Sequence, residues 1–452
     1  MMQLTYVRKG VLEWRDAREP ALQSPKEAIV RPFVASRCDG DKLPLFSNAT
    51  GAMKLGLAIH YLDPLVRDLL GSDPFKGPYP IGHECVAEVI ECGAEVKGVK
   101  RGAQVIVPWA ISCGQCFSCT HALTSKCTNS GDTLLAAYGF GSAMGPWGGA
   151  VSDRLRVPYA DAMLVPVPAG VDPVAIASAG DNITDGWRTV APHLERYPGA
   201  PVLIAGGAAH SIGLYAAGIA AALGSSRVDY LDSSRTRLEI AQSLGANPIL
   251  TQGGAGWCRK HAPRRSGPYL IGVDASASIA GLNYALRSLA PGGICTGVGY
   301  YFMRKAALPL TQMFANSSTL HIGVAHARAD LPRLLALLRT GKFKPEKVTT
   351  LAANWEDASR AFLERTTKVV VKRDPMNGAA VGNESVANTK LSGAAEAGTA
   401  PSGGALGRGT PGGTGSITNL AAPSVLTCAV AERGAGRDGA ADLDVASGQT
   451  PS

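Results

Sequence analysis

The sequence predicts an α/β protein that has a mostly-β N-terminal part followed by a doubly wound parallel sheet. Residues 1–165 contain short β runs interrupted by Gly and Pro, whereas residues 170–300 alternate β runs with helical stretches. The composition then changes abruptly near Asp374. A hydrophobic share of 46% and a charged share of 18% support a sizeable core, which excludes a wholly disordered chain.

The individual elements follow from these patterns in chain order. In the N-terminal part we expect strands over Glu27–Val34, Glu88–Glu91 and Gln104–Pro108. The alternating part predicts, in order, a strand over Val202–Ala205, a helix over Gly213–Leu223, a strand over Arg227–Leu231, a helix over Ser234–Leu244, and strands near Leu270–Val273 and Gly293–Val298. An amphipathic helix over 331–340 and a last strand over Thr367–Lys372 close the folded chain.

The changes in composition and in predicted secondary structure along the chain predict the domain boundaries. Other sequence features predict where the protein is located and which partners it lacks. We expect domains over residues 1–168, 169–303 and 304–373, and a disordered tail over 374–452 that has no aromatic residue beyond Asp374.

The charge-free stretch Leu203–Gly224 is long enough to span a bilayer, but its position among soluble βαβ units predicts a buried strand, loop and helix. The N-terminus lacks the apolar run of a signal peptide, so we expect a cytoplasmic protein without a membrane partner. The net charge of +8 includes no basic block, which argues against a nucleic-acid partner.

Four cysteines form a cluster with the spacing C-x2-C-x2-C-x7-C. They are Cys113, Cys116, Cys119 and Cys127. Four thiolates close a tetrahedral shell around Zn²⁺ and leave no position for substrate, so the cluster predicts a structural zinc site. An iron–sulfur cluster is the main alternative, because thiolates suit both. Either site requires a reducing compartment.

Several separated motifs together resemble one known family. Gly82-His83-Glu84, the cysteine lobe after it and the dinucleotide-type fold downstream look like the zinc-dependent medium-chain dehydrogenase/reductase family, which includes the zinc-type alcohol dehydrogenases. The resemblance covers roughly residues 25–373. It implies a GroES-like catalytic domain with a structural zinc lobe, a Rossmann dinucleotide-binding domain after it, and a return of the chain to the catalytic domain.

The resemblance also implies a second, open metal site. Its zinc ligands would be Cys38, His83 and Asp181, the last at a position where many members have Cys and some have Asp. One thiolate, one imidazole and one carboxylate leave room for water or substrate. Glu84 would stand behind the metal or act as a temporary ligand, and Asp41 would hydrogen-bond the far nitrogen of His83 and fix its tautomer.

The sequence departs from the family pattern beside this site. Many members have Ser or Thr two residues after the first ligand to pass the alcohol proton outward, but this chain has Gly40. A relay through that side chain is impossible, and His60 is our candidate substitute. The segment Lys42–Tyr79 is longer than the loop of many members, so we expect it to wall the substrate cleft.

A glycine-rich turn predicts the cofactor site. It joins the strand Val202–Ala205 to a helix and contains the candidate pyrophosphate-binding residues Gly206, Gly207, His210, Ser211, Ile212 and Gly213. Asp232 ends the next strand, where a carboxylate would bind the adenosine ribose and repel a 2′-phosphate, so NAD is favoured over NADP. Arg235 and Arg237 lie close enough to make NADP possible. Asp232 could also serve as a helix N-cap.

Together these features predict an enzyme that moves hydride between an alcohol, or its aldehyde or ketone, and NAD(P). Two zinc ions per chain and a small-molecule substrate go with this function. A zinc-independent NADPH quinone or enoyl reductase on the same fold and a non-catalytic dinucleotide sensor are the alternatives. The resemblance implies a homodimer or homotetramer, for which the aliphatic region Leu308–Val324 could supply an interface.

Overall fold

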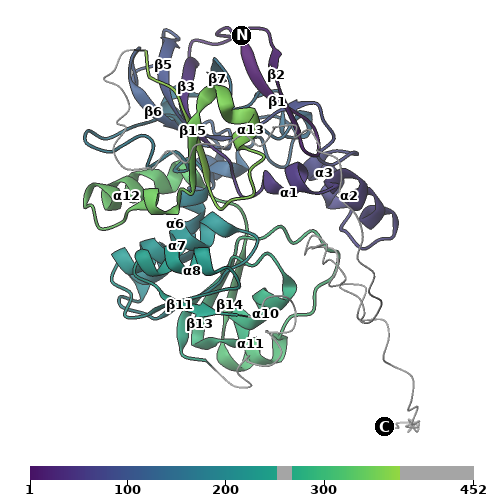
Figure 1. Cartoon of the computed structure of the whole chain (residues 1–452), viewed down its shortest axis with the longest axis vertical. Coiled ribbons are helices and arrows are strands. Elements are labelled where there is room, and N and C mark those ends of the chain that lie inside the picture. The colour runs from purple at the N-terminus through teal and green to yellow at the C-terminus, as the bar shows by residue number, and fades with distance from the viewer. Residues whose placement is uncertain (252–266, 377–452) are drawn as a thin grey trace, which may run out of the picture. The chain divides into compact units, whose positions relative to one another are not determined.

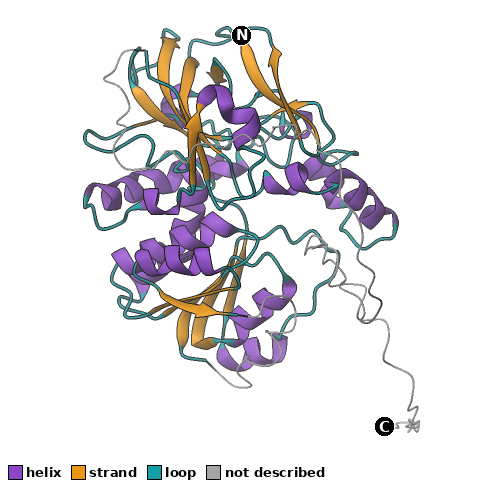
Figure 2. Cartoon of the chain, in the orientation of Figure 1, coloured by secondary structure: helices purple, strands orange, loops and turns teal. Residues whose placement is uncertain are grey.

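The computed structural model describes residues 1–251 and 267–376. The tail that we expect to be disordered lies outside the described residues from 377 onward, as does the segment 252–266. The predicted change in secondary structure along the chain is confirmed: the N-terminal part is mostly β, and a doubly wound α/β part follows it (Figure 2).

The mostly-β part is built on a seven-stranded sheet of the described residues. Six strands follow the order β15-β16-β3-β5-β6-β8, and β7 pairs with β3 outside this path. Their bounds are β3 Ala28–Ser36, β5 Glu84–Cys92, β6 Gln104–Val107, β7 Leu155–Val157, β8 Val165–Pro166, β15 Leu351–Asn354 and β16 Val369–Lys372. The antiparallel pairing of β16 with β3 brings the end of the folded chain beside the segment that leads to Cys38.

A smaller sheet and three short helices stand beside this sheet. β1 (Met2–Arg8) pairs with both β2 (Val11–Asp16) and β4 (Tyr79–Pro80), and shares a hydrophobic core with β3 and β5. The long segment Lys42–Tyr79 forms α1 (Lys42–Phe46), α2 (Ala49–Ala58) and α3 (Leu65–Leu70). The helical period of three to four residues is hard to recognise here, because α1 spans only five residues and α3 only six.

The α/β part contains a parallel sheet with the order β11-β10-β9-β12-β13-β14 among the described residues. The strands are β9 Val202–Ala205, β10 Val228–Asp232, β11 Asn247–Leu250, β12 Tyr269–Asp274, β13 Leu289–Gly297 and β14 Thr319–Ile322. Its helices are α6 Asn182–Arg196, α7 His210–Ala222, α8 Arg235–Ser243, α10 Ile279–Arg287, α11 Leu310–Asn316 and α12 Ala327–Arg339 (Figure 1). β14 lies beyond the boundary that we predict at residue 303, yet it pairs with β13, so this sheet extends to Ile322.

Close packing of α7 against this sheet explains its composition. Seven of its 13 residues are Ala or Gly, and most of the helix is buried. A Cβ at Gly213 would come within 2.9 Å of the Ala275 Cβ, so the helix approaches β12 as closely as it does only because position 213 is glycine. Strand, loop and helix thus occupy the apolar stretch Leu203–Gly224, as predicted. Among the described residues no helix combines the length and apolar character needed to cross a bilayer.

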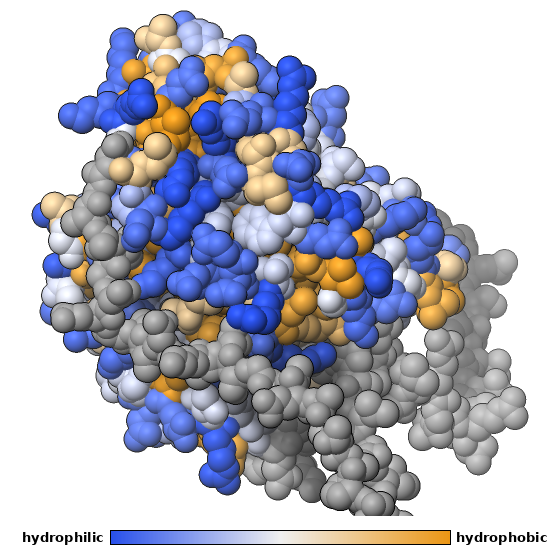
Figure 3. Space-filling view, turned by 45° about the horizontal axis from the view of Figure 1, so that its top comes forward, coloured by the Kyte–Doolittle hydropathy of each residue, from blue (hydrophilic) through white to orange (hydrophobic). Residues whose placement is uncertain are grey.

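Short elements complete the described chain. They are α4 Phe117–Thr120, η1 Thr124–Lys126, η2 Ser142–Met144, α5 Ala160–Met163, η3 Pro345–Val348, η4 Trp355–Asp357 and α13 Ala358–Ala361. The first two belong to the cysteine lobe, and the last two return the chain to the N-terminal sheets, where α13 packs near β2 and β15. The face shown in Figure 3 is mainly polar, with smaller hydrophobic patches between the polar residues.

Candidate active site

Three buried donor atoms meet where the mostly-β part faces α6. The Cys38 Sγ–H donates to Asp181 Oδ2 at 3.1 Å, and His83 Nε2 lies 3.3 Å from the same oxygen. All three donor atoms lie within 4.8 Å of one another. Donors 2.0–2.3 Å from a tetrahedral zinc ion are about 3.5 Å apart, so this thiol, imidazole and carboxylate fit a zinc ion. The structure therefore brings together the three residues predicted as ligands of the open site.

Aromatic side chains enclose the imidazole. The His83 ring stacks on Phe140 with centroids 4.5 Å apart and meets the edge of Trp109 at 6.5 Å. Burial lowers the pKa of His83, but the neighbouring carboxylates of Asp41 and Asp181 more than offset it and raise this pKa to about 9. Phe140 and Trp109 also belong to the hydrophobic cluster formed by α2 and α3. The long segment thus packs against the aromatic wall of the site.

Glu84 is held behind the donors and not among them. Its carboxylate accepts hydrogen bonds from Ser36 Oγ at 2.7 Å, the Asn182 backbone N–H at 3.0 Å and Lys368 Nζ at 2.6 Å. Lys368 is fully buried and also donates to Asn182 Oδ1 and to the Arg37 carbonyl. Burial alone would lower the pKa of Lys368. The neighbouring Glu84 carboxylate outweighs this effect, so the pKa of Lys368 is raised and the amine stays charged. This arrangement agrees with the prediction that Glu84 stands behind the metal, and its role as a temporary ligand stays a prediction.

One prediction at this site needs correction. Asp41 does not hydrogen-bond His83, because its Oδ1 lies 3.9 Å from Nδ1, and its Oδ2 instead accepts from the Cys38 backbone N–H at 3.1 Å. The buried Nδ1 of His83 has no hydrogen-bond partner in the described part of the chain. The side chain of His60 is exposed just after the end of α2, and its role as a proton relay stays a prediction.

The N-terminus of α7, predicted to bind pyrophosphate, holds a carboxylate. Asp39 Oδ2 accepts from the backbone N–H groups of Ser211 at 2.7 Å and Ile212 at 3.2 Å, and from Ser211 Oγ at 2.8 Å. Lys42 Nζ bridges Asp39 Oδ1 at 2.7 Å and His210 Nδ1 at 2.9 Å. Burial would raise the pKa of Asp39, but Lys42 holds it far below its usual range, so the carboxylate is ionised. An anion thus already occupies this helix end.

The glycine-rich turn itself has the predicted close approach. A Cβ at Gly206 would lie 2.6 Å from the Leu231 carbonyl oxygen, and one at Gly207 would lie 2.6 Å from the Ser276 Cα. The two glycines thus allow the turn to pack tightly against Leu231 and Ser276, as the close turns of dinucleotide-binding folds do.

Asp232 is engaged more fully than the sequence suggests. Arg237 donates to both of its oxygens, from Nε at 2.7 Å and from Nη2 at 2.6 Å, and Tyr230 Oη and the Ser234 N–H add two more hydrogen bonds. Ser234, and not Asp232, is the N-cap of α8, since its side chain accepts from the Arg237 N–H. The expected ribose acceptor is therefore already paired with a guanidinium.

The four-cysteine lobe has the geometry of a closed metal site. The sulfur atoms of Cys113, Cys116, Cys119 and Cys127 all lie within 4.8 Å of one another. Backbone N–H groups of Cys113 and Cys116 and the Asn129 side chain donate to sulfur atoms of the lobe at 3.3–3.4 Å. Such donors favour thiolates over thiols, which suits a structural zinc ion.

Comparison with known proteins identifies the family. The family model for the alcohol dehydrogenase GroES-like domain matches residues 55–169, and the model for zinc-binding dehydrogenases matches residues 211–340. A probable zinc-binding alcohol dehydrogenase of Mycobacterium tuberculosis is 27% identical over 76% of this chain and 80% of its own length. A medium chain reductase/dehydrogenase of an Acremonium species is 30% identical over 51% of this chain and 69% of its own length.

The chain belongs to the zinc-type medium-chain dehydrogenase/reductase family. Its structure resembles that of an alcohol dehydrogenase from Thermus sp. ATN1, with a TM-score of 0.66 and 26% identity over 82% of this chain and 99% of the other. The protein is accordingly an oxidoreductase of the zinc-type alcohol dehydrogenase family, with a GroES-like part and a Rossmann part.

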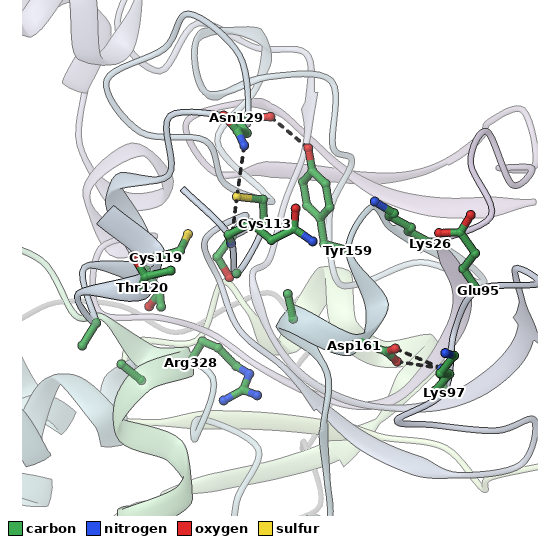
Figure 4. A pocket seen from close by; sticks show the side chains of 17 residues that line it. Lys26, Glu95, Lys97, Cys113, Cys119, Thr120, Asn129, Tyr159, Asp161 and Arg328 are labelled. Atoms are coloured by element: carbon green, nitrogen blue, oxygen red, sulfur yellow. Dashed lines mark hydrogen bonds between the residues drawn. The ribbon is translucent and has the colours of Figure 1, made fainter. Parts of the chain in front are cut away.

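A pocket of about 800 Å³ in this dehydrogenase lies beside the cysteine lobe and not at Cys38. Charged side chains of both signs line it, among them Lys26, Glu95 and Arg328 (Figure 4). The Asp161 carboxylate accepts from the Lys97 backbone N–H at its rim. Its lining includes none of the three donors of the open metal site.

Some residues of the dehydrogenase site are not foreseeable from sequence patterns. Lys368 lies in the predicted strand Thr367–Lys372, directly before β16, where a lysine attracts no notice. Asn182, which donates to Cys38 Sγ at 3.1 Å, looks like an ordinary first residue of a helix. Tyr300 follows β13 and lies against Gly40. The only signal that could have pointed to Tyr300 is the missing side chain at Gly40, which leaves a space for another residue.

Proposed function

We propose that this dehydrogenase oxidises an alcohol, and reduces the corresponding aldehyde or ketone, with zinc at Cys38, His83 and Asp181 and with NAD as the favoured cofactor. The observation that carries the proposal is the meeting of one thiol, one imidazole and one carboxylate within 4.8 Å in a buried site. Three protein ligands of this kind are typical of catalytic zinc, because they leave one position for substrate. When bound there, zinc supplies Lewis-acid polarisation of the substrate oxygen.

The residues around the donors keep this arrangement in place. Asn182 Nδ2 donates to both Cys38 Sγ at 3.1 Å and Asp181 Oδ2 at 2.9 Å, which fixes two of the donors relative to each other. The Glu84–Lys368 ion pair anchors Asn182 through its backbone and its side chain. Phe140 and Trp109 exclude water from one face of the His83 ring, so the site is dry on that side.

The cofactor proposal rests on the turn before α7. Gly206 and Gly207 allow the tight turn that dinucleotide-binding folds have at this place, and Asp232 stands at the end of β10 where a ribose would lie. The Asp232 carboxylate would repel a 2′-phosphate, which is why NAD is favoured, although Arg237 partly neutralises it. Asp39 must leave the N-terminus of α7 if a pyrophosphate is to take its place.

The test is the zinc content of the purified protein, with turnover measured on a panel of alcohols with NAD. We expect two zinc ions per chain in the wild type, one in Cys38→Ala and one in Cys113→Ala, since each variant disrupts a different site. Asp181→Ala should abolish turnover and leave NADH binding in place. A single zinc ion that Cys38→Ala does not remove would refute the open metal site and favour a zinc-independent reductase.

A further inference from the structure

Gly40 leaves a space that another side chain fills. It lies two residues after Cys38, and its backbone N–H donates to Cys38 Sγ at 3.3 Å. A Cβ built at Gly40 would overlap the hydroxyl of Tyr300 and lie 3.1 Å from its ring carbon Cζ. The Tyr300 hydroxyl therefore stands where the first atoms of a side chain at position 40 would be, and it reaches this place from the α/β part of the molecule.

The surroundings of the hydroxyl agree with this position. Burial raises the pKa of Tyr300 well above its usual value. A phenol keeps its proton at neutral pH in any case, so the hydroxyl can donate a hydrogen bond beside the three metal-binding candidates. The residue as a whole is 39% exposed.

The segment that carries Tyr300 is braced by the long Lys42–Tyr79 segment. The Asp63 N–H donates to the Phe302 carbonyl at 2.8 Å, and the Arg304 N–H donates to the Tyr61 carbonyl at 2.9 Å. The Tyr300 ring stacks on Phe302 with centroids 5.2 Å apart and planes 7° from parallel. These contacts fix the backbone that follows Tyr300 in the chain. They thereby help to hold the Tyr300 hydroxyl against Gly40.

We propose that the Tyr300 hydroxyl hydrogen-bonds the substrate oxygen at the Cys38–His83–Asp181 site and replaces the hydroxyl that Gly40 cannot supply. The oxygen of an alcohol or carbonyl compound placed between the three donors and Gly40 meets this hydroxyl. Tyr300 is then a catalytic residue of this chain that contacts the substrate from the α/β part. The inference rests on the proposed function, because it requires a metal at the three donors.

The test exploits the overlap between the two positions. Tyr300→Phe removes the hydroxyl and leaves the ring. The Cβ of Gly40→Ser overlaps the Tyr300 hydroxyl, whereas in the double variant Gly40→Ser/Tyr300→Phe the nearest ring atom is Cζ at 3.1 Å, which a small shift of the ring relieves. The control is Tyr301→Phe, which removes the hydroxyl of the next residue, a group that donates to Asp274 instead.

The readout is binding of 2,2,2-trifluoroethanol, an unreactive alcohol, to Co²⁺-substituted protein, followed by the visible absorption of the cobalt. Co²⁺ content per chain first shows that the open site is intact in each variant, with Cys38→Ala as the blank. We expect Tyr300→Phe to weaken binding roughly 2- to 12-fold, the loss of one hydrogen bond. Gly40→Ser should also weaken binding, the double variant should recover most of the loss, and Tyr301→Phe should match the wild type.

The outcomes separate the two proposals. Cobalt absent from the open site of the wild type would refute the proposed function and this inference together. If cobalt is present but Tyr300→Phe binds trifluoroethanol as tightly as the wild type, only the role of Tyr300 is wrong. A double variant whose loss equals the product of the two single losses would likewise rule out a shared position for the two hydroxyls.

Discussion

Asp39 places a negative charge where a dinucleotide would place its own. The N-terminus of a helix attracts anions because its backbone N–H groups are free and its dipole is positive there. At α7 that attraction is already satisfied by the Asp39 carboxylate, which Ser211 and Ile212 hold from the backbone. Because Asp39 is tethered to the same chain, a pyrophosphate has to compete with it.

We therefore expect Asp39→Asn to bind NADH more tightly than the wild type, by roughly 2- to 30-fold, the range of a charge at a helix end. Fluorescence titration with NADH measures this, with the exposed Asp68→Asn as the control for loss of one carboxylate. Weaker binding by Asp39→Asn would show that the carboxylate supports the cofactor, for instance by placing Lys42.

At the level of single residues, the family resemblance was the source of the ligand prediction. It implied Cys38, His83 and Asp181, and these three residues do meet in space. Lys368 and Tyr300 could not be predicted, because lysine and tyrosine are common and their positions beside Glu84 and Gly40 arise only from tertiary pairing.

At the scale of elements, strand β10 and the helix α8 after it together determine which partners Asp232 has. β10 ends at Asp232, and the first turn of α8 returns Arg237 to that carboxylate as a two-pronged ion pair. The same helix keeps Arg235 exposed. A single turn of helix thus decides whether Asp232 is free to accept hydrogen bonds from a ribose or shares its charge with a guanidinium.

Arg237→Ala should raise the ratio of kcat/KM with NAD to kcat/KM with NADP, by roughly tenfold or more, because charged hydrogen bonds of this kind are strong. Freed from Arg237, Asp232 can bind both ribose hydroxyls and repels a 2′-phosphate. Arg235→Ala is the matched control on the same helix and should leave the ratio near its wild-type value. An unchanged or lower ratio in Arg237→Ala would contradict this role for the ion pair.

Elements with a clear period were predictable, and elements built by tertiary contact were not. Val202–Ala205 matches its prediction, and Ser234–Leu244 brackets α8 with its two caps. The helices α1 to α3 lie in a segment whose length, but not whose structure, stood out. β14 was missed because its four residues, Thr319–Ile322, are largely exposed and lack the apolar run of the inner strands.

At the scale of the whole molecule, one exposed apolar face remains without a partner in the described chain. Phe314 on α11 is 88% exposed, with Leu310 at 66% beside it and Ile322 at 55% on β14. β14 is also an edge strand of the parallel sheet, with free backbone groups along one side. Exposed apolar side chains next to an open sheet edge favour association with a second copy of this chain.

Phe314→Glu should accordingly shift the protein toward the monomer mass of 46.7 kDa in light scattering. The charge would have to be buried in the interface, at a cost that few dimers tolerate. Leu55→Glu, an exposed position on α2 with 59% exposure, is the control and should keep the wild-type mass. Equal masses for the wild type and Phe314→Glu would place the interface elsewhere.

The long-range contacts of Lys368 can form only after this residue has been synthesised, long after the residues that it contacts. Its amine bonds the carbonyl of Arg37, a residue 331 positions earlier in the chain. A ribosome that adds about 5–20 residues per second needs about 17–66 s to cover that span. During this interval the Cys38 thiol and the His83 imidazole exist without the ion pair that later locks Glu84 and Asn182 behind them. The open site therefore reaches its final shape only after Lys368 has been added to the chain.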